Sequence, residues 1–365
     1  MPLLINNDEV EQVLTMADTL AVLEELYQDI GRGSAIYRAR TDLHTPTTTS
    51  LGPDVPGAHY LKTMDGAWPR RQVASIRLSS DVLAFPLQDG LRRRVKLPAA
   101  AGNRWLGLVL LFSTANGELL AILNDGVLQR FRVGATNGIA AKYLARKDAR
   151  TAGILGSGWQ AGTQLMALCA ARPLIEDIKV FSPTPGHAEA FAEEMASTLD
   201  RPVRCVPTPE DAVRDVDVAV TATNSRTPFF PAEWFKPGMH LSCMQRDEAT
   251  DACFELADVV VFNTRARERN VTSTDLAEVE QRFGFEIRDH QFPRELNWDD
   301  YPDLGELVTG QTPGRTSDSQ RTLFLNSIGV GAQFAAVAQH IYTLARERGL
   351  GRELPIDWFV ESVHP

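Results

Sequence analysis

The stretch TAGILGSGWQAG, from Thr151 to Gly162, constrains the fold of this chain most strongly. A short apolar run ends in Gly156 and Gly158, and a helical pattern begins directly after them. The first glycine allows a tight turn out of a strand, the second lets the backbone approach a pyrophosphate, and small Ala161 lets the helix pack closely. Glycines that merely turn the chain are the alternative. We predict a dinucleotide-binding turn, whose candidate cofactor-binding residues are Gly156, Ser157, Gly158, Trp159, Gln160 and Ala161.

The segment after this turn alternates between strand-like and helical patterns. The strand-like runs are Ile178–Phe181, Val203–Val206, Val216–Thr223, Met239–Cys243 and Val259–Phe262. Such alternation predicts a Rossmann-type, doubly wound parallel sheet and an α/β fold class. We add Thr223, at the end of its strand, to the candidate cofactor-binding residues. A long helical pattern rich in Ala and Gly, Leu323–Gly349, closes the chain.

The first third of the chain has a different pattern. A helical opening at Asp8–Ile30 is followed by alternating apolar and polar residues within Tyr60–Pro86. Two apolar runs, Gly107–Phe112 and Leu119–Leu123, flank an Asn-Gly pair at Asn116, which is typical of a hairpin. We therefore expect an antiparallel β layer behind a helix, separate from the nucleotide-binding part.

Composition and charge limit the classes of partner and the cellular compartment that we expect for this chain. The net charge of -10 argues against nucleic acid and anionic membranes, because both would repel such a surface. No run reaches transmembrane length and no signal segment opens the chain. Four cysteines without metal-type spacing suggest no disulfide framework, so a reducing cytoplasm fits best. The seven histidines are scattered, and we expect no metal site.

Three charged residues are candidates for chemistry outside the turn. Lys62 stands on an alternating strand, where a solvated outer-face lysine is the alternative. Arg132 precedes a run of small residues that leaves room for a carboxylate, although a surface salt bridge is equally compatible. Asp247 follows a predicted strand, and ligands of open α/β sheets bind beyond strand carboxyl ends. A loop cap is the alternative reading of that aspartate.

Together these motifs resemble the ornithine cyclodeaminase/mu-crystallin family. The resemblance rests on Arg40, Lys62 and Arg132, the turn from Gly156 to Ala161, and Asp247, in that order. It implies a split α+β substrate-binding and dimerisation domain, residues 1–130 and 320–365, around a Rossmann domain, residues 131–319. By the same resemblance, Arg40, Lys62 and Arg132 hold a substrate α-carboxylate. The resemblance also makes Asp247 and Lys62 the catalytic candidates. In it, Asp247 exchanges a proton with an amine or imine.

The chain departs from the family pattern in two places. Gln245 and Arg246 stand where the family has small residues before the aspartate, so we expect a bulkier and more cationic site mouth. The stretch Thr47–Ser50 offers no carboxylate where ornithine-processing members carry one. A second ammonium group on the substrate would therefore lack an evident partner beyond Asp247, which argues against ornithine.

We expect an NAD(P)-dependent oxidoreductase of amino or imino acids, acting as a homodimer on a small amino, imino or 2-oxo acid. A cyclodeaminase, in which the hydride leaves and returns, is one alternative. A second alternative is a non-catalytic binder of reduced cofactor and a small ligand, as mu-crystallin resemblance allows.

Cofactor choice depends on the end of the second strand, where Ser182 and Thr184 stand without an acidic neighbour. Because nothing there repels a 2′-phosphate, we expect tolerance of both cofactors with a mild lean to NADP(H).

Overall fold

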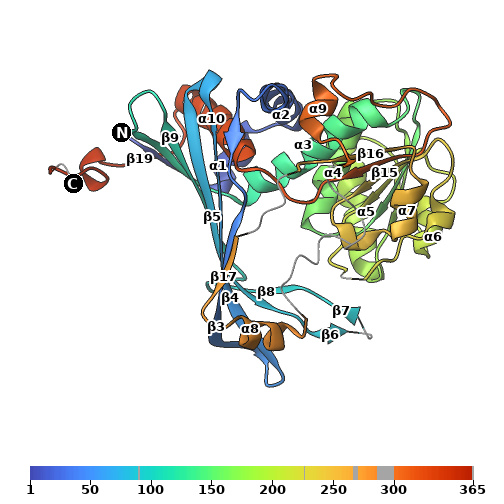
Figure 1. Ribbon diagram of the computed structural model, residues 1–365, viewed down its shortest axis with the longest axis horizontal. Helices are drawn as coiled ribbons and strands as arrows, with labels where there is room; N and C mark the ends of the chain where they lie inside the picture. The colour runs from blue at the N-terminus through green and yellow to red at the C-terminus, as the bar shows by residue number, and fades with distance from the viewer. Residues whose placement is uncertain (89–90, 226, 266–269, 286–299, 364–365) are drawn as a thin grey trace.

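The computed structural model describes residues 1–88, 91–225, 227–265, 270–285 and 300–363. Its chain forms a long, mostly antiparallel sheet and a separate parallel sheet, with a layer of helices between them (Figure 1). The amino terminus and the C-terminal tail lie near each other at the far side of the long sheet (Figure 1). The α/β fold class predicted from the sequence, a Rossmann-type sheet beside an α+β part, is confirmed.

The long sheet is built mainly from the first third of the chain. Along it the strand order is β17-β3-β4-β5-β9-β10-β1-β19, with β2 paired to β4 and β8 to β5. The strands are β1 (Leu3–Ile5), β2 (Ile36–Tyr37), β3 (Thr41–Gly52), β4 (Val55–Trp68), β5 (Val73–Ala84), β8 (Val95–Leu97), β9 (Leu106–Ser113), β10 (Leu119–Asn124), β17 (Asn270–Ser273) and β19 (Arg352–Glu353). The predicted hairpin joins β9 to β10, and Gly117 in its turn has φ +80°. Residues of β5 alternate between a buried and a more exposed face, as the period-two pattern predicts.

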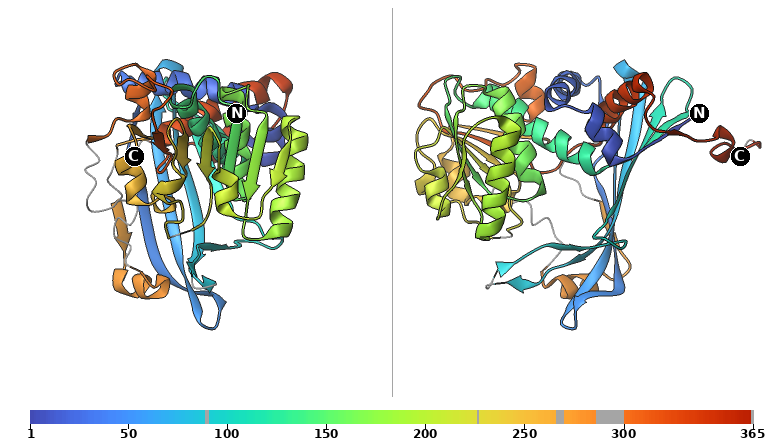
Figure 2. Two further views of the ribbon diagram at one scale, coloured as in Figure 1. Left: turned by 90° about the vertical axis from the view of Figure 1, so that its right-hand side faces the viewer. Right: turned by 180° about the vertical axis from the view of Figure 1, so that it is seen from behind.

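Helices cover the face of the long sheet that looks towards the parallel sheet (Figure 2). They are α1 (Asn7–Val13), α2 (Met16–Gly31), α3 (Gly126–Leu144) and α10 (Gly331–Arg348), while α8 (Leu276–Phe283) packs on β3 and β4 further along. The predicted opening helix is two helices, because Leu14 adopts an extended conformation and Thr15 caps α2 by accepting a hydrogen bond from the Asp18 N–H. Apolar side chains from α1, α2, α3 and α10 and from the sheet form one core, while Val279 and Phe283 of α8 pack in a separate cluster with residues of β4 and β5.

The parallel sheet has the strand order β13-β12-β11-β14-β15-β18-β16. Its strands are β11 (Thr151–Leu155), β12 (Asp177–Phe181), β13 (Val203–Cys205), β14 (Val218–Thr221), β15 (His240–Cys243), β16 (Val259–Phe262) and β18 (Thr322–Leu325); α4 (Trp159–Ala171), α5 (Pro185–Leu199), α6 (Pro209–Val213), α7 (Asp251–Leu256) and α9 (Leu304–Val308) surround it. From β11 the chain runs outward through β12 and β13 on one side and through β14 and β15 on the other, where β18 and then β16 complete the sheet. The order therefore reverses between β11 and β14, which is the switch point where such sheets bind dinucleotides.

The structure departs from the predicted boundaries in three places. Thr322–Leu325 is a buried strand of the parallel sheet, not the start of the closing helix, which begins only at Gly331. Residues 270–273 pair with β3, so this segment belongs to the long sheet although it lies within the predicted Rossmann range. The helix α3 begins at Gly126, before residue 131. The chain therefore crosses between the long-sheet part and the parallel-sheet part more often than a single inserted domain would require.

An excursion between β5 and β9 reaches from the long sheet towards the parallel sheet. It contains the short hairpin of β6 (Leu87–Gln88) and β7 (Leu91–Arg92), followed by β8, which returns to pair with β5 (Figure 1). Arg93 forms a β-bridge with Ser225, in the loop that follows β14. The excursion thus joins the long sheet to the carboxyl edge of the parallel sheet.

Candidate active site

The glycine turn has the geometry that a dinucleotide requires. Gly156 follows β11 with φ +117°, a left-handed conformation, and a Cβ there would collide with the carbonyl oxygen of Ala222. Gly158 is the N-cap of α4, which has no side-chain cap, and no atom lies within 4 Å of where its Cβ would be. Buried Ala161 lets the first turn of α4 pack against the sheet. The residues therefore fit a pyrophosphate at the N-terminus of α4.

Two further residues of the turn contact α3. Trp159 is exposed, and the guanidinium of Arg130 lies 4.4 Å from its ring centroid. The Gln160 amide donates a 2.7 Å hydrogen bond to Gln129 Oε1. The helices approach so closely that a Cβ on Gly134 would overlap the backbone of Thr163. The first turn of α4 is thus packed directly on α3, the helix that carries Arg132.

The long sheet and α3 gather the three predicted carboxylate-binding residues into one cationic cluster. Arg40 precedes β3 and forms a bidentate ion pair with buried Asp42, at 2.8 and 2.9 Å. Lys62 lies opposite Asp42 in the register of β3 and β4. Arg132 on α3 is 7% exposed, and Arg40 is among the charges that act most strongly on it. The structure therefore brings Arg40, Lys62 and Arg132 together.

Lys62 lies on the inner face of the sheet, so the alternative of a solvated outer lysine is wrong. It is half-buried, and its Nζ atom lies 4.9 Å from the Tyr60 ring centroid. Burial, and then the cations Arg40, Arg77, Arg94 and Lys96, hold the pKa of Lys62 well below its usual value. An anionic ligand would relieve this repulsion.

Arg132 is a buried cation without a carboxylate among its described contacts. Its guanidinium donates a 3.0 Å hydrogen bond to Gln333 Oε1 and lies 4.8 Å from the Phe334 ring centroid, both on α10. Its Nε atom has no hydrogen-bond partner in the described chain. Burial and nearby Arg77 lower the pKa of Arg132, although a guanidinium stays charged at neutral pH. A surface salt bridge is thus excluded, and the site favours an incoming anion.

The loops after β14 and β15 are joined by Glu248, which the sequence did not single out. Its buried carboxylate accepts hydrogen bonds from the Thr221 hydroxyl (2.8 Å), from the N–H and hydroxyl of Thr223 (2.6 and 2.8 Å), and from the Gln245 N–H (2.8 Å). The Thr223 hydroxyl therefore donates to Glu248, so this hydroxyl can face a cofactor only as an acceptor. Burial raises the pKa of Glu248, and these hydrogen bonds oppose the rise.

Asp247 lies one residue before Glu248, in the short 3-10 helix η3 (Arg246–Glu248) beyond the carboxyl end of β15. It is half-buried. Asn326, which follows β18, links this edge to α3, because its amide donates to the Val133 carbonyl at 3.0 Å and lies 3.7 Å from Met244 Sδ. The structure thus places Asp247 at the edge of the parallel sheet that α3 adjoins.

Ser182 and Thr184 follow β12, the strand beside β11. Thr184 is the N-cap of α5, its side chain makes no capping hydrogen bond, and it is exposed. Both residues therefore lie between the carboxyl end of β12 and the first turn of α5.

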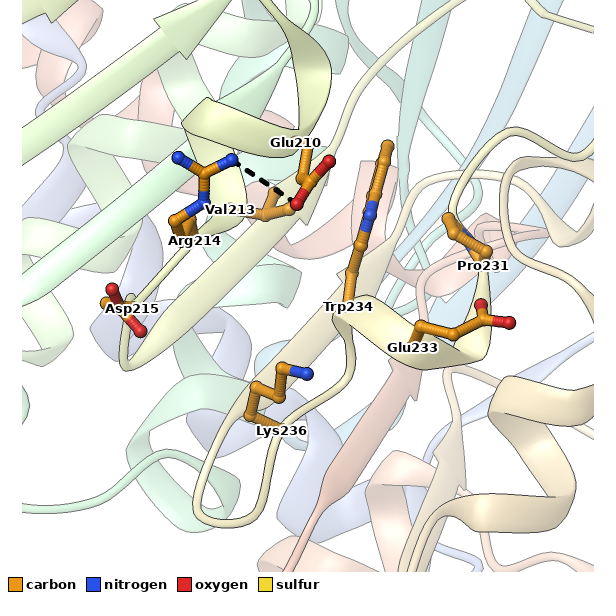
Figure 3. Close-up of a pocket in the computed structure, with 8 residues that line it drawn as sticks. All are labelled: Glu210, Val213, Arg214, Asp215, Pro231, Glu233, Trp234 and Lys236. Carbon is orange, nitrogen blue, oxygen red and sulfur yellow. Dashed lines mark hydrogen bonds and ion pairs between the residues drawn. The ribbon is translucent and has the colours of Figure 1, made fainter.

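A separate hollow of about 470 Å³ lies on the parallel-sheet part (Figure 3). Its lining includes Glu210, Arg214, Trp234 and Lys236, from segments that lead into β14 and β15 (Figure 3). It therefore lies at the amino ends of the strands, opposite the edge at which such sheets bind cofactors.

Among the described residues, no group of three or more His, Cys, Asp or Glu side chains could hold a metal ion. No helix in the described ranges is long and apolar enough to cross a membrane.

Comparison with known proteins identifies the family. The profile of the ornithine cyclodeaminase/mu-crystallin family matches residues 97–349. The chain belongs to this family. Delta(1)-pyrroline-2-carboxylate reductase of Bacillus cereus is 31% identical over 253 residues, which cover 68% of this chain and 74% of the relative. Alanine dehydrogenase of Archaeoglobus fulgidus is 26% identical over 368 residues, covering 96% and 98%.

A solved structure extends the similarity to nearly the whole fold. Delta(1)-pyrroline-2-carboxylate reductase of Thermococcus litoralis, in complex with NADH and L-proline, superposes with a TM-score of 0.74. The two chains are 25% identical, and the match covers 96% of this chain and 100% of the other. The family membership inferred from the sequence motifs is thereby confirmed.

In this member of the ornithine cyclodeaminase/mu-crystallin family, Arg246 departs from the family sequence pattern, but its effect differs from the one we expected. Arg246 does not make the site mouth more cationic, because it is 3% exposed. Its guanidinium pairs with Asp251, donates to the Ala249 carbonyl at 3.0 Å and lies 4.0 Å from the Phe254 ring centroid. Arg246 therefore anchors η3 to α7, and the expectation of a cationic mouth was wrong for this residue.

Sequence reasoning also missed three cations that act on Lys62 in this family member, namely Arg77, Arg94 and Lys96. Arg77 on β5 donates to Asp125 at 2.6 Å, and Lys96 on β8 pairs with Asp81 at 2.9 Å. Period-two alternation around Arg77 was the one signal that could have placed it on the same face as buried residues. Lys96 gave no comparable signal, because β8 is only three residues long.

Proposed function

We propose that this chain is an NAD(P)(H)-dependent oxidoreductase that acts at the Cα atom of small amino, imino or 2-oxo acids. The observation that carries the proposal is the position of Arg132. It lies in the cationic cluster, on the helix against which the first turn of the dinucleotide helix packs. A nicotinamide cofactor supplies the hydride chemistry when bound, so the protein must hold a carboxylate and handle one proton.

Arg40, Lys62 and Arg132 hold the substrate α-carboxylate in this proposal. Guanidinium groups bind carboxylates with paired, charge-assisted hydrogen bonds, and the low exposure of Arg132 strengthens such a bond. Asp247 exchanges a proton with the substrate nitrogen. In the reductive direction the imine carbon gains a hydride and the nitrogen gains a proton, which yields the amino acid and the oxidised cofactor.

The cofactor turn accepts either NAD(H) or NADP(H), with a mild lean to NADP(H). No acidic side chain stands at Ser182 or Thr184 to repel a 2′-phosphate, and the uncapped first turn of α5 favours an anion. No arginine or lysine is adjacent in the sequence to neutralise that phosphate, so the lean is small. The relative from Thermococcus litoralis binds NADH.

The long sheet and its helices form the substrate-binding and dimerisation part, and the parallel sheet forms the cofactor-binding part. The outward face of the long sheet supports a homodimer. Leu43 and Ile76 on this face are 36% and 38% exposed. Leu61 lies opposite Leu43 in register, Leu110 lies opposite Ile76, and Leu78 follows Ile76 by two residues on the same face of β5. A second copy of the chain would bury this apolar face.

Because all four cysteines are unpaired, we place the protein in the cytoplasm.

A cyclodeaminase is the second candidate, and the hairpin of β3 and β4 argues against it. Thr47 to Ser50 lie in β3 and provide no carboxylate for a distal ammonium group.

The variant Asp247→Asn tests the proton exchange that we assign to this residue. We expect the variant to lose turnover while binding reduced cofactor normally, because Asp247 lies outside the phosphate turn. The exposed control Asp148→Asn should behave as wild type. A near-normal kcat in Asp247→Asn would remove this residue from the mechanism.

A further inference from the structure

A buried amide on the closing helix holds the guanidinium of Arg132. Gln333 is the third residue of α10, and its Oε1 atom accepts a 3.0 Å hydrogen bond from Arg132 and a 3.1 Å bond from the Val330 N–H. Its Nε2 atom donates to the hydroxyls of Tyr27 (2.8 Å) and Thr136 (2.7 Å). Each half of the amide therefore has two partners of the matching kind, which fixes the orientation of the amide.

We propose that Gln333 is a positioning residue for substrate binding, which orients the guanidinium of Arg132 towards the substrate carboxylate. The bond to Gln333 is made by Nη1 of Arg132, so the edge formed by Nε and Nη2 is left for a carboxylate. The Nε atom has no hydrogen-bond partner in the part of the chain that the structure describes. Guanidinium edges bind carboxylates through two parallel hydrogen bonds. This inference rests on the proposed function and adds a residue to the same site.

The turn between β18 and α10 permits the close approach on which this orientation depends. A Cβ on Gly329 would overlap Nη1 of Arg132 and lie 3.0 Å from Oε1 of Gln333. Ile328, the residue before this glycine, has φ +60°, a left-handed conformation that β-branched side chains rarely adopt. Such strained residues persist where their surroundings hold them, and they cluster at ligand-binding sites. The backbone of this turn thus lies directly against the guanidinium and its amide partner.

The same network ties this turn to the parallel sheet. Asn263, which follows β16, accepts a hydrogen bond from the Tyr27 hydroxyl and donates a 2.8 Å bond to the Ile328 carbonyl. Because the Tyr27 hydroxyl also accepts the bond from Gln333, the network joins α2, α10 and the carboxyl end of β16. Tyr27 and Gln333 are at most 1% exposed. A buried network whose amides and hydroxyls all find partners is rigid, as a positioning role requires.

The first turn of α10 is also packed directly on β4, the strand that carries Lys62. A Cβ on Gly331 would overlap the carbonyl of Asp65 on β4. Gln333 therefore holds Arg132 from a helix end whose backbone touches the strand of Lys62. Since the two carboxylate-binding residues come from different elements, this contact sets their relative position.

A double-mutant cycle tests the proposal. The full-length protein, saturated with NADH and without amine, is titrated with pyruvate and with 2-oxobutyrate, and nicotinamide fluorescence reports binding. Gln333→Met removes the acceptor, and we expect about tenfold weaker binding of the acid, equivalent to about 1.4 kcal/mol. In an Arg132→Ala background the same change should alter the affinity by less than about twofold, because its effect acts through the missing guanidinium. Equal tenfold losses in both backgrounds would overturn the proposal.

Two further variants separate positioning from a role in the fold alone. Gln339→Met, on the same helix, is the matched control and should bind the acid as wild type does, because Gln339 donates to Thr343 instead. Gly329→Ala keeps every hydrogen-bonding side chain but displaces the Arg132 guanidinium, so we expect at least about fivefold weaker binding. The affinity for NADH should stay within about twofold of wild type throughout. Wild-type affinity for the acid in both Gln333→Met and Gly329→Ala would show that the network only supports the fold.

Turnover separates this inference from the proposed function. Weaker binding of the acid by Gln333→Met, without NADH oxidation by the wild-type protein when ammonia is added, would uphold the positioning role and contradict the oxidoreductase. Steady oxidation of NADH by the wild-type protein, with unchanged acid affinity in Gln333→Met, would overturn the positioning role alone. Failure of both acids to bind the wild-type protein would overturn both.

Discussion

The hydroxyl of Thr223 donates a 2.8 Å hydrogen bond to the buried carboxylate of Glu248. Through this bond, and through the bond from the Gln245 N–H, a single side chain fixes the loop after β14 and the loop after β15. Asp247 is the neighbour of Glu248 in the second loop. The geometry of the proposed proton-exchanging residue therefore depends on an acid that itself faces the interior.

Replacing Glu248 by Gln should destabilise the fold and reduce turnover. The amide would present donors to at least one of the N–H and O–H groups that now donate to the carboxylate, at a cost of about 2 to 3 kcal/mol in the free energy of unfolding. Urea unfolding and kcat/KM measure the two effects. Glu233→Gln, the same change at an exposed acid, is the control and should alter neither. Wild-type stability and kinetics in Glu248→Gln would show that these hydrogen bonds are dispensable.

Arg132→Ala should raise KM for any carboxylate substrate by about a hundredfold, equivalent to about 2.7 kcal/mol. Arg132→Lys should recover part of the loss, because it keeps the charge but not the paired geometry. Steady-state kinetics of both variants, with exposed Arg150→Ala as the control, make the measurement. If KM stayed near wild type in Arg132→Ala, the residue would serve only to pack α3 against α10.

Lys62 should make the stability of the protein depend on pH. Its pKa is lowered in the native state, so between that pKa and the ordinary lysine value near 10.4 the unfolded chain binds more protons than the native protein. The free energy of unfolding contributed by Lys62 therefore rises with pH across this window. Burial lowers the pKa of Lys62 most, and the cations Arg40, Arg77, Arg94 and Lys96 lower it further.

Urea unfolding of the wild-type protein and of Lys62→Met at several pH values isolates this contribution. We expect Lys62→Met to be more stable than wild type at the low end of the window, with the difference shrinking as the pH rises. Lys147→Met should show no such trend. A difference independent of pH would mean that Lys62 titrates as an ordinary surface lysine.

Cofactor choice should respond to a charge at Thr184. Thr184→Asp places a carboxylate at the exposed N-cap of α5, where it would repel a 2′-phosphate and leave a ribose hydroxyl a good acceptor. We expect KM for NADPH to rise at least about tenfold while KM for NADH changes little. In the wild-type protein the two KM values should lie within about a hundredfold of each other. A larger preference for NADH there would show that another residue selects against the phosphate.

The sequence predicted the parallel sheet well because its signals are local. The turn at Gly156, the apolar strand runs and the helical patterns between them each lie within a few residues. The strand Thr322–Leu325 was missed for the same reason, since four apolar residues directly before an Ala-rich helix read as part of that helix. Its partners, β15 and β16, lie about 60 or more residues earlier in the chain.

The family pattern identified Arg40, Lys62 and Arg132, and the structure brings them together. Their neighbours could not be found this way, because the contacts are distant in sequence. Arg77 meets Asp125 48 residues later, and Arg132 meets Gln333 201 residues later. The inward position of Arg246 was equally hidden, since its burial depends on α7 packing against β15 and on Asp251.

The most direct test of the account follows reduced cofactor spectroscopically while the pure protein is supplied with ammonia or methylamine and a panel of 2-oxo acids. The account predicts steady oxidation of the cofactor that requires both the amine and the acid. Ammonia release from a diamino acid without net change in the cofactor would contradict it and identify a cyclodeaminase. Cofactor binding with neither reaction would identify a non-catalytic binder.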